Sequence, residues 1–159
     1  MSRFSHVDGE GKPRMVDVSK KEVTEREAVA EGCVFLPVEV LDSVERGELP
    51  KGDLATTARL AGISAAKRTW DLIPLCHQIP LSLVEVDLHL DRDLPGVVVQ
   101  ARVKGEAKTG VEMEALTAVS VACLTVYDMV KAVCREATIG RICLLEKRGG
   151  KSGEYVRKA

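Results

Sequence analysis

Apolar and polar residues alternate along three stretches of the chain, which is the pattern of half-buried β-strands. The first stretch covers residues 24–37 and ends at Pro37. The other two cover residues 81–91 and 96–107, and the turn sequence DRDLPG connects them, so they are predicted to form an antiparallel hairpin. A final strand is predicted over residues 141–148, from the sequence RICLLEKR.

Two helices are predicted between the first strand and the hairpin. Residues 37–50 contain a short helix that Gly47 and Pro50 bring to an end. Asp53 can cap the N-terminus of a second helix over residues 54–70, whose small apolar residues recur at helical spacing. The second helix is therefore predicted to have one small apolar face.

The longest predicted helix begins near KTGVEMEAL, residues 108–116, where Thr109 and Glu112 have the spacing of a capping box. Residues 115–127 carry no charge at all, and a helix that is apolar on every side is buried on every side. The predicted hairpin can cover only one flank, so we expect a second subunit to cover the rest. Charge returns at Asp128.

The predicted order is strand, helices, two antiparallel strands, helix, strand. This order matches the ferredoxin-like plait, an α+β fold in which helices pack on one face of an antiparallel sheet. We expect a single catalytic α+β domain over residues 21–148. A flexible N-terminal segment is expected over residues 1–20, and a flexible C-terminal tail over residues 149–159.

Composition and charge argue against several classes of protein. The formal net charge is −1 and aromatic residues make up 3% of the chain, which disfavours a nucleic-acid-binding protein or an RNA-recognition module. No apolar run has membrane-spanning length, and no secretory signal is visible. The five cysteines are odd in number and contain no C-x-x-C pair, which disfavours a disulfide framework or a zinc site. We therefore expect a cytoplasmic protein with reduced thiols and no metal ligand set.

Candidate chemistry begins in the segment LIPLCHQIPL, residues 72–81, where two prolines flank Cys76 and His77. Proline disfavours both a full helix and a full strand, so this apolar segment is predicted to be a loop. His77 is either an ordinary structural histidine or a side chain that the loop presents to a pocket. His89 lies on the polar face of a predicted strand and is expected at the surface.

Asp128 and Lys131 are three residues apart in the sequence, so they share one helical face. They form either an exposed ion pair of little energetic value or a partly buried pair tuned for acid–base chemistry. The residues alone leave both interpretations open. Lys51 lies just before a predicted helix N-terminus, where the helix dipole disfavours a cation. Glu114 falls outside the capping box that can explain Glu112.

Three longer segments carry a family resemblance: MVDVSKKEVTEREAVAEG, TARLAGISAAKRTWDLIPLCH and KTGVEMEALTAVSVACLTVYDMVKAV. Together they resemble the molybdenum cofactor biosynthesis protein C family, the cyclic pyranopterin monophosphate synthases, and the resemblance covers residues 4–148. One departure is visible, because the family usually has a His-Pro pair where this chain has Gln78-Ile79. We expect this departure to alter the pocket wall without removing function.

The resemblance implies a lyase with a ferredoxin-like fold, assembled as a hexamer that is a trimer of dimers. It implies a small-molecule substrate, 3′,8-cyclo-7,8-dihydroguanosine 5′-triphosphate, made by a radical SAM enzyme upstream. The products would be cyclic pyranopterin monophosphate and diphosphate. No nucleic acid or membrane is expected as a partner. Magnesium bound with the triphosphate stays open, because no ligand set can be assigned. The alternative is a non-catalytic ferredoxin-like domain that binds a small ligand and regulates a partner.

Site residues follow from the same resemblance. It implies catalytic roles for Lys51, Asp128 and Lys131. It implies substrate contacts for Leu75, Cys76, His77, Glu112, Met113 and Glu114, and it places Lys67 and Lys147 toward the triphosphate. A lysine moves protons near neutral pH only where burial or nearby positive charge lowers its pKa, and two neighbouring lysines would supply that charge.

Helix geometry separates these residues within one chain. Glu114 and Asp128 would be ~21 Å apart along a helix, and Glu114 and Lys131 ~25 Å, at 1.5 Å per residue. Two such helices running antiparallel across a twofold axis would bring opposite ends together. We therefore expect active sites at a dimer interface, with Glu112 and Glu114 from one subunit and Asp128 and Lys131 from its neighbour.

Overall fold

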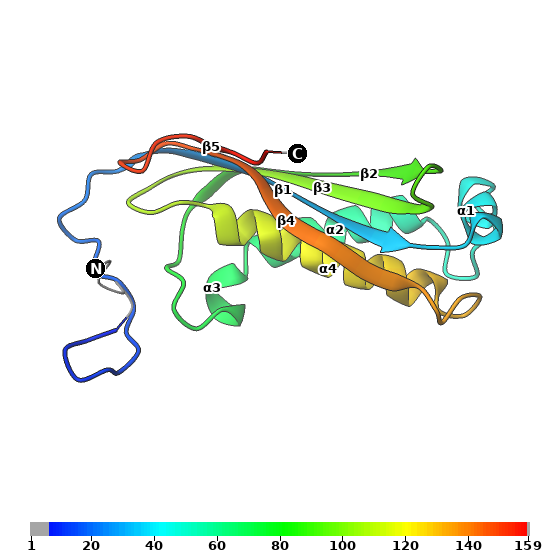
Figure 1. Ribbon diagram of the computed structural model, residues 1–159, viewed down its shortest axis with the longest axis horizontal. Coiled ribbons are helices and arrows are strands. Elements are labelled where there is room, and N and C mark those ends of the chain that lie inside the picture. The colour runs from blue at the N-terminus through cyan, green and yellow to red at the C-terminus, as the bar shows by residue number, and fades with distance from the viewer. Residues whose placement is uncertain (1–6, 159) are drawn as a thin grey trace.

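The computed structural model describes residues 7–158, which form a five-stranded antiparallel sheet with four helices on one side (Figure 1). The strands are β1 (Thr24–Phe35), β2 (Leu81–Asp91), β3 (Gly96–Ala107), β4 (Thr138–Arg148) and β5 (Tyr155–Val156). They lie in the order β2-β3-β1-β4-β5. The helices are α1 (Val38–Glu45), α2 (Leu54–Ala66), α3 (Thr69–Leu72) and α4 (Glu112–Val130). The predicted α+β class and ferredoxin-like plait are confirmed.

Strand β1 lies inside the sheet, paired antiparallel with both β3 and β4. Its alternating small and apolar residues form the face toward the helices, where Ala28, Ala30 and Val34 are fully buried. Gly32 lies on the same face, and a Cβ atom there would approach a methyl carbon of Val119 in α4 to 2.7 Å. The small residues of β1 therefore let α4 lie close against the sheet.

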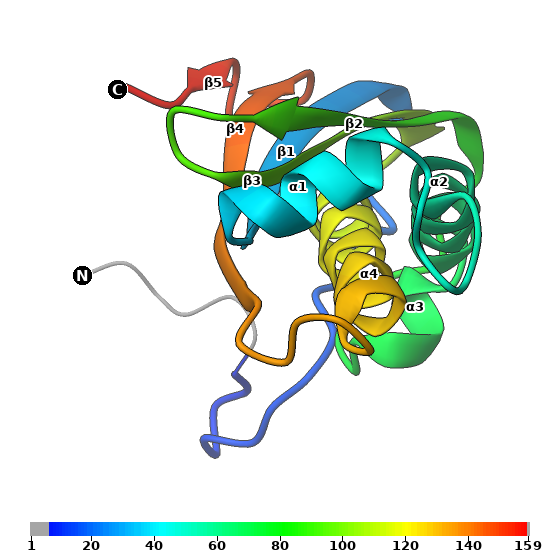
Figure 2. The same ribbon diagram turned by 90° about the vertical axis from the view of Figure 1, so that its right-hand side faces the viewer.

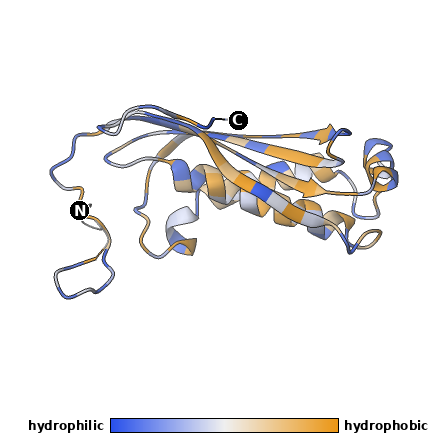
Figure 3. Cartoon of the chain, in the orientation of Figure 1, coloured by the Kyte–Doolittle hydropathy of each residue, from blue (hydrophilic) through white to orange (hydrophobic). Residues whose placement is uncertain are grey.

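Helix α4 runs beneath the sheet, and α2 lies beside it on the same side (Figure 2). The two helices approach closely, because a Cβ atom at Gly62 of α2 would lie 3.0 Å from the carbonyl oxygen of Ala118. Apolar residues follow α4 along its length (Figure 3). By length and composition alone this helix could cross a membrane, but more than half of that segment is buried inside the fold. The expectation that the sheet alone covers α4 within one chain is wrong, since α2 covers a second flank.

Two element boundaries differ from the prediction. The second helix ends at Ala66 instead of residue 70, and the short α3 follows it. The buried Thr69 hydroxyl donates a hydrogen bond to the Ala66 carbonyl at 3.0 Å, and such a local bond competes with a continuing helix. Strand β4 begins at Thr138 and not at Arg141, which has a φ of 55° at an irregularity in the pairing with β1. That irregularity interrupts the alternation by which a strand is recognised.

One predicted cap is present and the other is not. The Asp53 carboxylate caps α2 by accepting a hydrogen bond from the Thr56 backbone N–H at 3.0 Å. The predicted capping box of Thr109 and Glu112 is wrong, because the N-cap of α4 is Val111 and no side chain caps that end. Glu112 is therefore available for other contacts.

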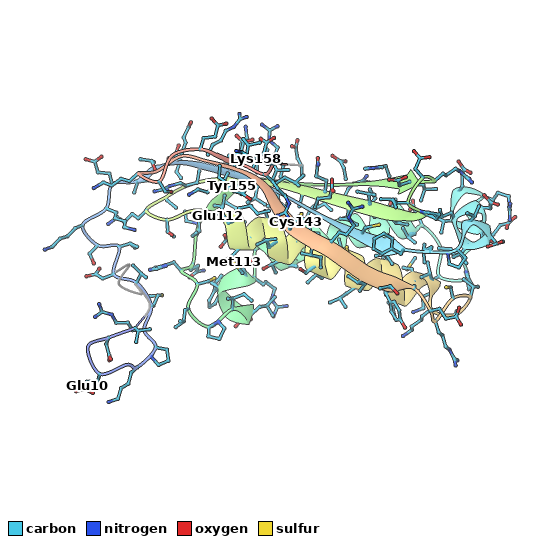
Figure 4. All side chains as sticks on the ribbon, in the orientation of Figure 1. Glu10, Glu112, Met113, Cys143, Tyr155 and Lys158 are labelled. Atoms are coloured by element: carbon cyan, nitrogen blue, oxygen red, sulfur yellow. The ribbon has the colours of Figure 1, made fainter. Side chains whose placement is uncertain are left out.

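The segments on either side of the predicted domain contact it. Tyr155 of β5, labelled in Figure 4, pairs with Lys147 of β4, and this short pairing was not predicted from the sequence. Ahead of β1, the carbonyl oxygen of Val16 lies 2.8 Å from His77 Nε2, and Val7 and Pro13 form an isolated bridge within the N-terminal segment itself. The flexibility expected for residues 1–20 and 149–159 stays a prediction, and residues 1–6 and 159 lie outside the described part of the chain.

Candidate active site

A lysine–aspartate–lysine group lies at the C-terminal end of α4. Asp128 accepts a hydrogen bond from Lys51 Nζ at 2.6 Å and forms an ion pair with Lys131 Nζ at 2.8 Å. Lys51 belongs to the loop before α2, where Gly52 turns the chain with a φ of 87°. The side chains are 41% exposed for Lys51 and 50% exposed for Asp128 and Lys131. The structure thus brings together the three residues expected to be catalytic.

Asp128 and Lys131 stabilise each other's ionised forms. The hydrogen bond with Lys131, followed by that with Lys51, lowers the pKa of Asp128 to about 2. The hydrogen bond with Asp128 raises the pKa of Lys131. For Lys131 this differs from the expected lowering of a lysine pKa, because a neighbouring carboxylate favours the protonated ammonium form. In a single chain Asp128 is therefore an anion that orients two lysines, and Lys131 carries a proton to donate.

A 440 Å³ cavity lies at the other end of α4, between the loop before β2 and the segment before β1. It is lined by the six expected substrate contacts, Leu75, Cys76, His77, Glu112, Met113 and Glu114. Figure 4 marks Glu112 and Met113 at this end of the helix. Ile79 also lines the cavity, so the departure from the family at Gln78-Ile79 does reach its wall.

Glu114 is the most unusual side chain in this cavity wall. Its side chain is 3% exposed, and its Oε2 atom has no hydrogen-bond partner among the described residues. Burial raises the pKa of Glu114 to about 7. Burial also raises the pKa of the Cys76 thiol, with a further contribution from Glu114. Cys76 is therefore a thiol and not a reactive thiolate, and Glu114 is a carboxyl group that needs a partner.

The loop that carries His77 has the irregular form expected from its prolines. A turn closes it, in which the Cys76 N–H donates to the Ile73 carbonyl at 3.1 Å. His77 Nε2 lies 2.8 Å from the carbonyl oxygen of Val16. His89 is exposed, as predicted. The sequence left open whether His77 is structural or lines a pocket, and its position satisfies both descriptions.

A second, basic cavity of 540 Å³ adjoins the first and shares several wall residues with it. Its basic residues are Lys21, Arg26, Lys108, Lys147, Arg148 and Lys151, and its acidic residues are Glu22 and Glu112. The Glu112 carboxylate lines both cavities and lies 3.5 Å from Lys147 Nζ, which lines the basic one. The excess of positive charge suits a polyanionic ligand such as a chain of phosphates.

Arg26 is a member of the basic cavity that the sequence did not predict. It lies on the face of β1 that farther along holds Ala28 and Ala30, so a cation occupies an apolar position of the alternating pattern. This cation at an otherwise apolar position was the sequence signal from which Arg26 could have been identified. Gly149 and Gly150 have φ values of 92° and 76°, and a Cβ atom at Gly150 would meet Arg26 Nη1 at 1.8 Å. Only glycine suits this backbone and leaves room for the guanidinium group.

Within one chain the structure keeps Lys67 apart from the cavities, so its contact with the triphosphate stays a prediction, and it separates the two ends of α4 as the helix geometry predicted. Lys67 is exposed at the C-cap of α2 and lines none of the cavities described above. Glu114 and Asp128 lie on one continuous helix, so their separation is ~21 Å along its axis. A single chain therefore does not place the Glu114 end and the Lys131 end of α4 in one reaction centre.

The fold and these side chains define a ferredoxin-like α+β protein with an acid–base group and a basic ligand cavity. Residues 15–150 match the MoaC family, and the chain belongs to that family. It is 57% identical over 159 residues to a cyclic pyranopterin monophosphate synthase of Cereibacter sphaeroides strain KD131, with 100% of both chains covered. It is 54% identical over 154 residues to the protein of that name from Brucella ovis, covering 97% of this chain and 93% of the relative.

Proposed function

We propose that this protein is a cyclic pyranopterin monophosphate synthase of molybdenum cofactor biosynthesis. As a lyase it would convert 3′,8-cyclo-7,8-dihydroguanosine 5′-triphosphate to cyclic pyranopterin monophosphate and diphosphate. Relatives that carry this name match the whole chain or nearly all of it. The observation that carries the proposal is the basic cavity, which shares a wall with the cavity that holds Glu114, whose Oε2 atom has no hydrogen-bond partner in residues 7–158. A ligand with a nitrogen-rich ring and a triphosphate needs such a pair of environments.

The ring system would occupy the 440 Å³ cavity. Ring and exocyclic N–H groups of a guanine-like base are hydrogen-bond donors, and Glu114 Oε2 is an acceptor that has no partner among the described residues. A bound donor would stabilise the ionised form of Glu114 and lower its pKa from about 7. The apolar loop residues Leu75 and Ile79 would exclude water around the ring.

The triphosphate would extend into the basic cavity. Forming the cyclic phosphate requires a substrate oxygen to bond to the phosphorus that remains, while the bond from that phosphorus to the departing diphosphate breaks. Fixed cations such as Arg26 and Lys147 stabilise the negative charge that develops on the leaving group. Magnesium would enter with the triphosphate, and Glu22 and Glu112 are the carboxylates in this cavity.

Rearranging the ring system also requires protons to move at several heteroatoms, so several acid–base groups must converge on the substrate. Lys51, Asp128 and Lys131 supply such a group. Within one chain the hydrogen bond with Asp128 raises the pKa of Lys131, so Lys131 holds its proton, and positive charge brought near it in the assembled site would be needed for it to release that proton at neutral pH. Asp128 would orient both lysines in its ionised form.

The substrate would be bound between two subunits. One stripe of α4 stays uncovered within the chain, with exposed Met113, Leu124 and Lys131 on the same helical face. Two α4 helices paired antiparallel through this stripe would place Lys131 of each chain near the Glu114 end of the other. Each dimer would then hold two equivalent sites. We further propose that three such dimers form a hexamer, that the protein is cytoplasmic, and that a radical SAM enzyme supplies its substrate.

One assay tests the proposed activity. The protein is incubated with the cyclo-dihydroguanosine triphosphate, and the pyranopterin and diphosphate are measured together. The proposal predicts equal amounts of the two products. Binding of the substrate without either product would contradict it and would favour a non-catalytic ligand-binding domain.

A further inference from the structure

Residues 16–21 lie against the 440 Å³ cavity and form part of its wall. Val16, Val18 and Lys21 line the cavity. The side chains of Val16 and Val18 are half-buried, whereas the intervening Asp17 and the following Ser19 are exposed. This alternation shows that the segment presents one side to the cavity, and we name residues 16–21 the strap.

The strap is attached to the domain by two hydrogen bonds that involve its backbone carbonyl groups. His77 Nε2 lies 2.8 Å from the carbonyl oxygen of Val16. Lys108 Nζ donates to the carbonyl oxygen of Ser19 at 2.9 Å. A carbonyl oxygen only accepts, so His77 must donate, and its proton must be on Nε2. In the neutral ring the lone pair is then on Nδ1.

The strap also determines where a cation lies. Lys21 lines both the 440 Å³ cavity and the basic cavity, so it stands where the two meet. The Lys21 N–H donates to the Val18 carbonyl at 3.0 Å, which makes a turn that carries the side chain toward this boundary. Anchoring Val16 therefore also fixes Lys21.

We propose that His77 is a positioning residue: its Nε2–H group holds the strap in place through the Val16 carbonyl and so builds one wall of the ligand cavity. Because this bond occupies Nε2, only Nδ1 remains for proton exchange with a ligand. The identity of that ligand rests on the proposed function, but the attachment of the strap does not.

Two substitutions of His77 distinguish the roles of its two ring nitrogens. His77→Gln places an amide N–H near the position of Nε2, whereas His77→Asn places one near Nδ1. Trypsin cleavage after Lys20 and Lys21 under native conditions, without substrate, measures release of the strap. We expect His77→Asn to be cut about tenfold faster than wild type, the scale of one lost hydrogen bond, and His77→Gln within about threefold of wild type. His89→Gln, at an exposed histidine, is the matched control and should leave the rate unchanged. Equal cleavage rates for the Gln and Asn variants would overturn the proposal.

A spectroscopic measurement on unaltered protein avoids any folding defect of the variants. In protein labelled with ¹⁵N-histidine, the His77 signals, assigned by their loss in His77→Gln, should show the proton on Nε2 and a lone pair on Nδ1. A neutral ring with its proton on Nδ1 would refute the proposal. Neither measurement needs turnover, so failure of the strap proposal is distinguishable from failure of the proposed enzymatic activity.

Discussion

Glu114 and Asp128 are carboxylic acids on the same helix whose surroundings change their pKa values in opposite directions. Burial raises the pKa of Glu114 to about 7, whereas the hydrogen bonds from Lys131 and Lys51 lower that of Asp128 to about 2. Two titratable groups separated in this way suit different roles. Asp128 fits a permanently charged group that orients lysines, and Glu114 fits a group that changes its ionisation when a ligand binds.

Substitution of Lys51 and of Lys131 directly tests the catalytic roles assigned to these two residues. Lys51→Ala and Lys131→Ala should each fold normally, because both side chains are substantially exposed. Each should lower kcat by about 10² or more, the scale of a positioned acid–base group. Lys12→Ala is the matched control, a lysine with a 72% exposed side chain outside both cavities, and should retain far more activity. Turnover within threefold of wild type in both Lys51→Ala and Lys131→Ala would remove the catalytic assignment.

The raised pKa of Glu114 has a measurable consequence for stability. The folded chain holds a proton on Glu114 that the unfolded chain releases, so the free energy of unfolding should fall as the pH rises from about 4.5 through about 7. The full effect is about 3 kcal/mol relative to Glu114→Gln, which has no carboxylate to bury.

Denaturant titration at each pH measures the free energy of unfolding of the protein with Glu114 and of its Glu114→Gln variant. Both proteins also carry Leu124→Arg, a substitution expected to separate the subunits. Parallel pH profiles for Glu114 and its Gln variant would show that the buried carboxyl group titrates normally.

At the scale of helices and strands, some elements could be predicted from the sequence pattern and others could not. The hairpin and β1 were predictable because alternation continues over many residues. The break between α2 and α3, by contrast, involves the hydroxyl of one buried Thr69, and β5 has only two residues. Neither feature leaves a periodic pattern in the sequence, because the first is a local hydrogen bond of one side chain and the second is the pairing of two residues with β4. The family resemblance predicted the lysine–aspartate–lysine group. Arg26 was not predicted as a site residue, because the fold is what brings β1 beside the end of β4.

Close packing of β1 against α4 gives an element-scale prediction. Gly32→Ala should lower the free energy of unfolding by about 1–3 kcal/mol, because the new methyl group would lie 2.7 Å from Val119 and 3.2 Å from Cys123 Sγ. Gly9→Ala is the control, since a Cβ atom there meets nothing within 4 Å. Thermal or denaturant unfolding of both variants measures the difference. A Gly32→Ala variant as stable as Gly9→Ala would show that α4 does not approach the sheet this closely.

At the scale of the whole molecule, the uncovered stripe of α4 predicts how the subunits meet. Leu124 is 58% exposed at the middle of that stripe, so Leu124→Arg should place a charge in the proposed interface and separate the subunits. Leu94→Arg, at a leucine that is 49% exposed in the turn of the β2–β3 hairpin, is the control and should assemble like wild type. Light scattering measures assembly and circular dichroism verifies folding. Unchanged assembly of Leu124→Arg would place the interface elsewhere.

The central claim is that each active site combines the Glu114 end of one α4 with the Lys131 end of another, and subunit mixing tests it most directly. Inactive Glu114→Ala and inactive Lys131→Ala are refolded together, and mass spectrometry verifies that the chains exchange. A mixed dimer has one site with both lesions and one with neither, so random pairing should restore roughly 25% of wild-type activity. Mixing Lys51→Ala with Lys131→Ala is the control and should restore nothing, because both residues belong to the same half of the site. Activity that stays at the level of the separate Glu114→Ala and Lys131→Ala variants, despite confirmed exchange, would contradict the shared site.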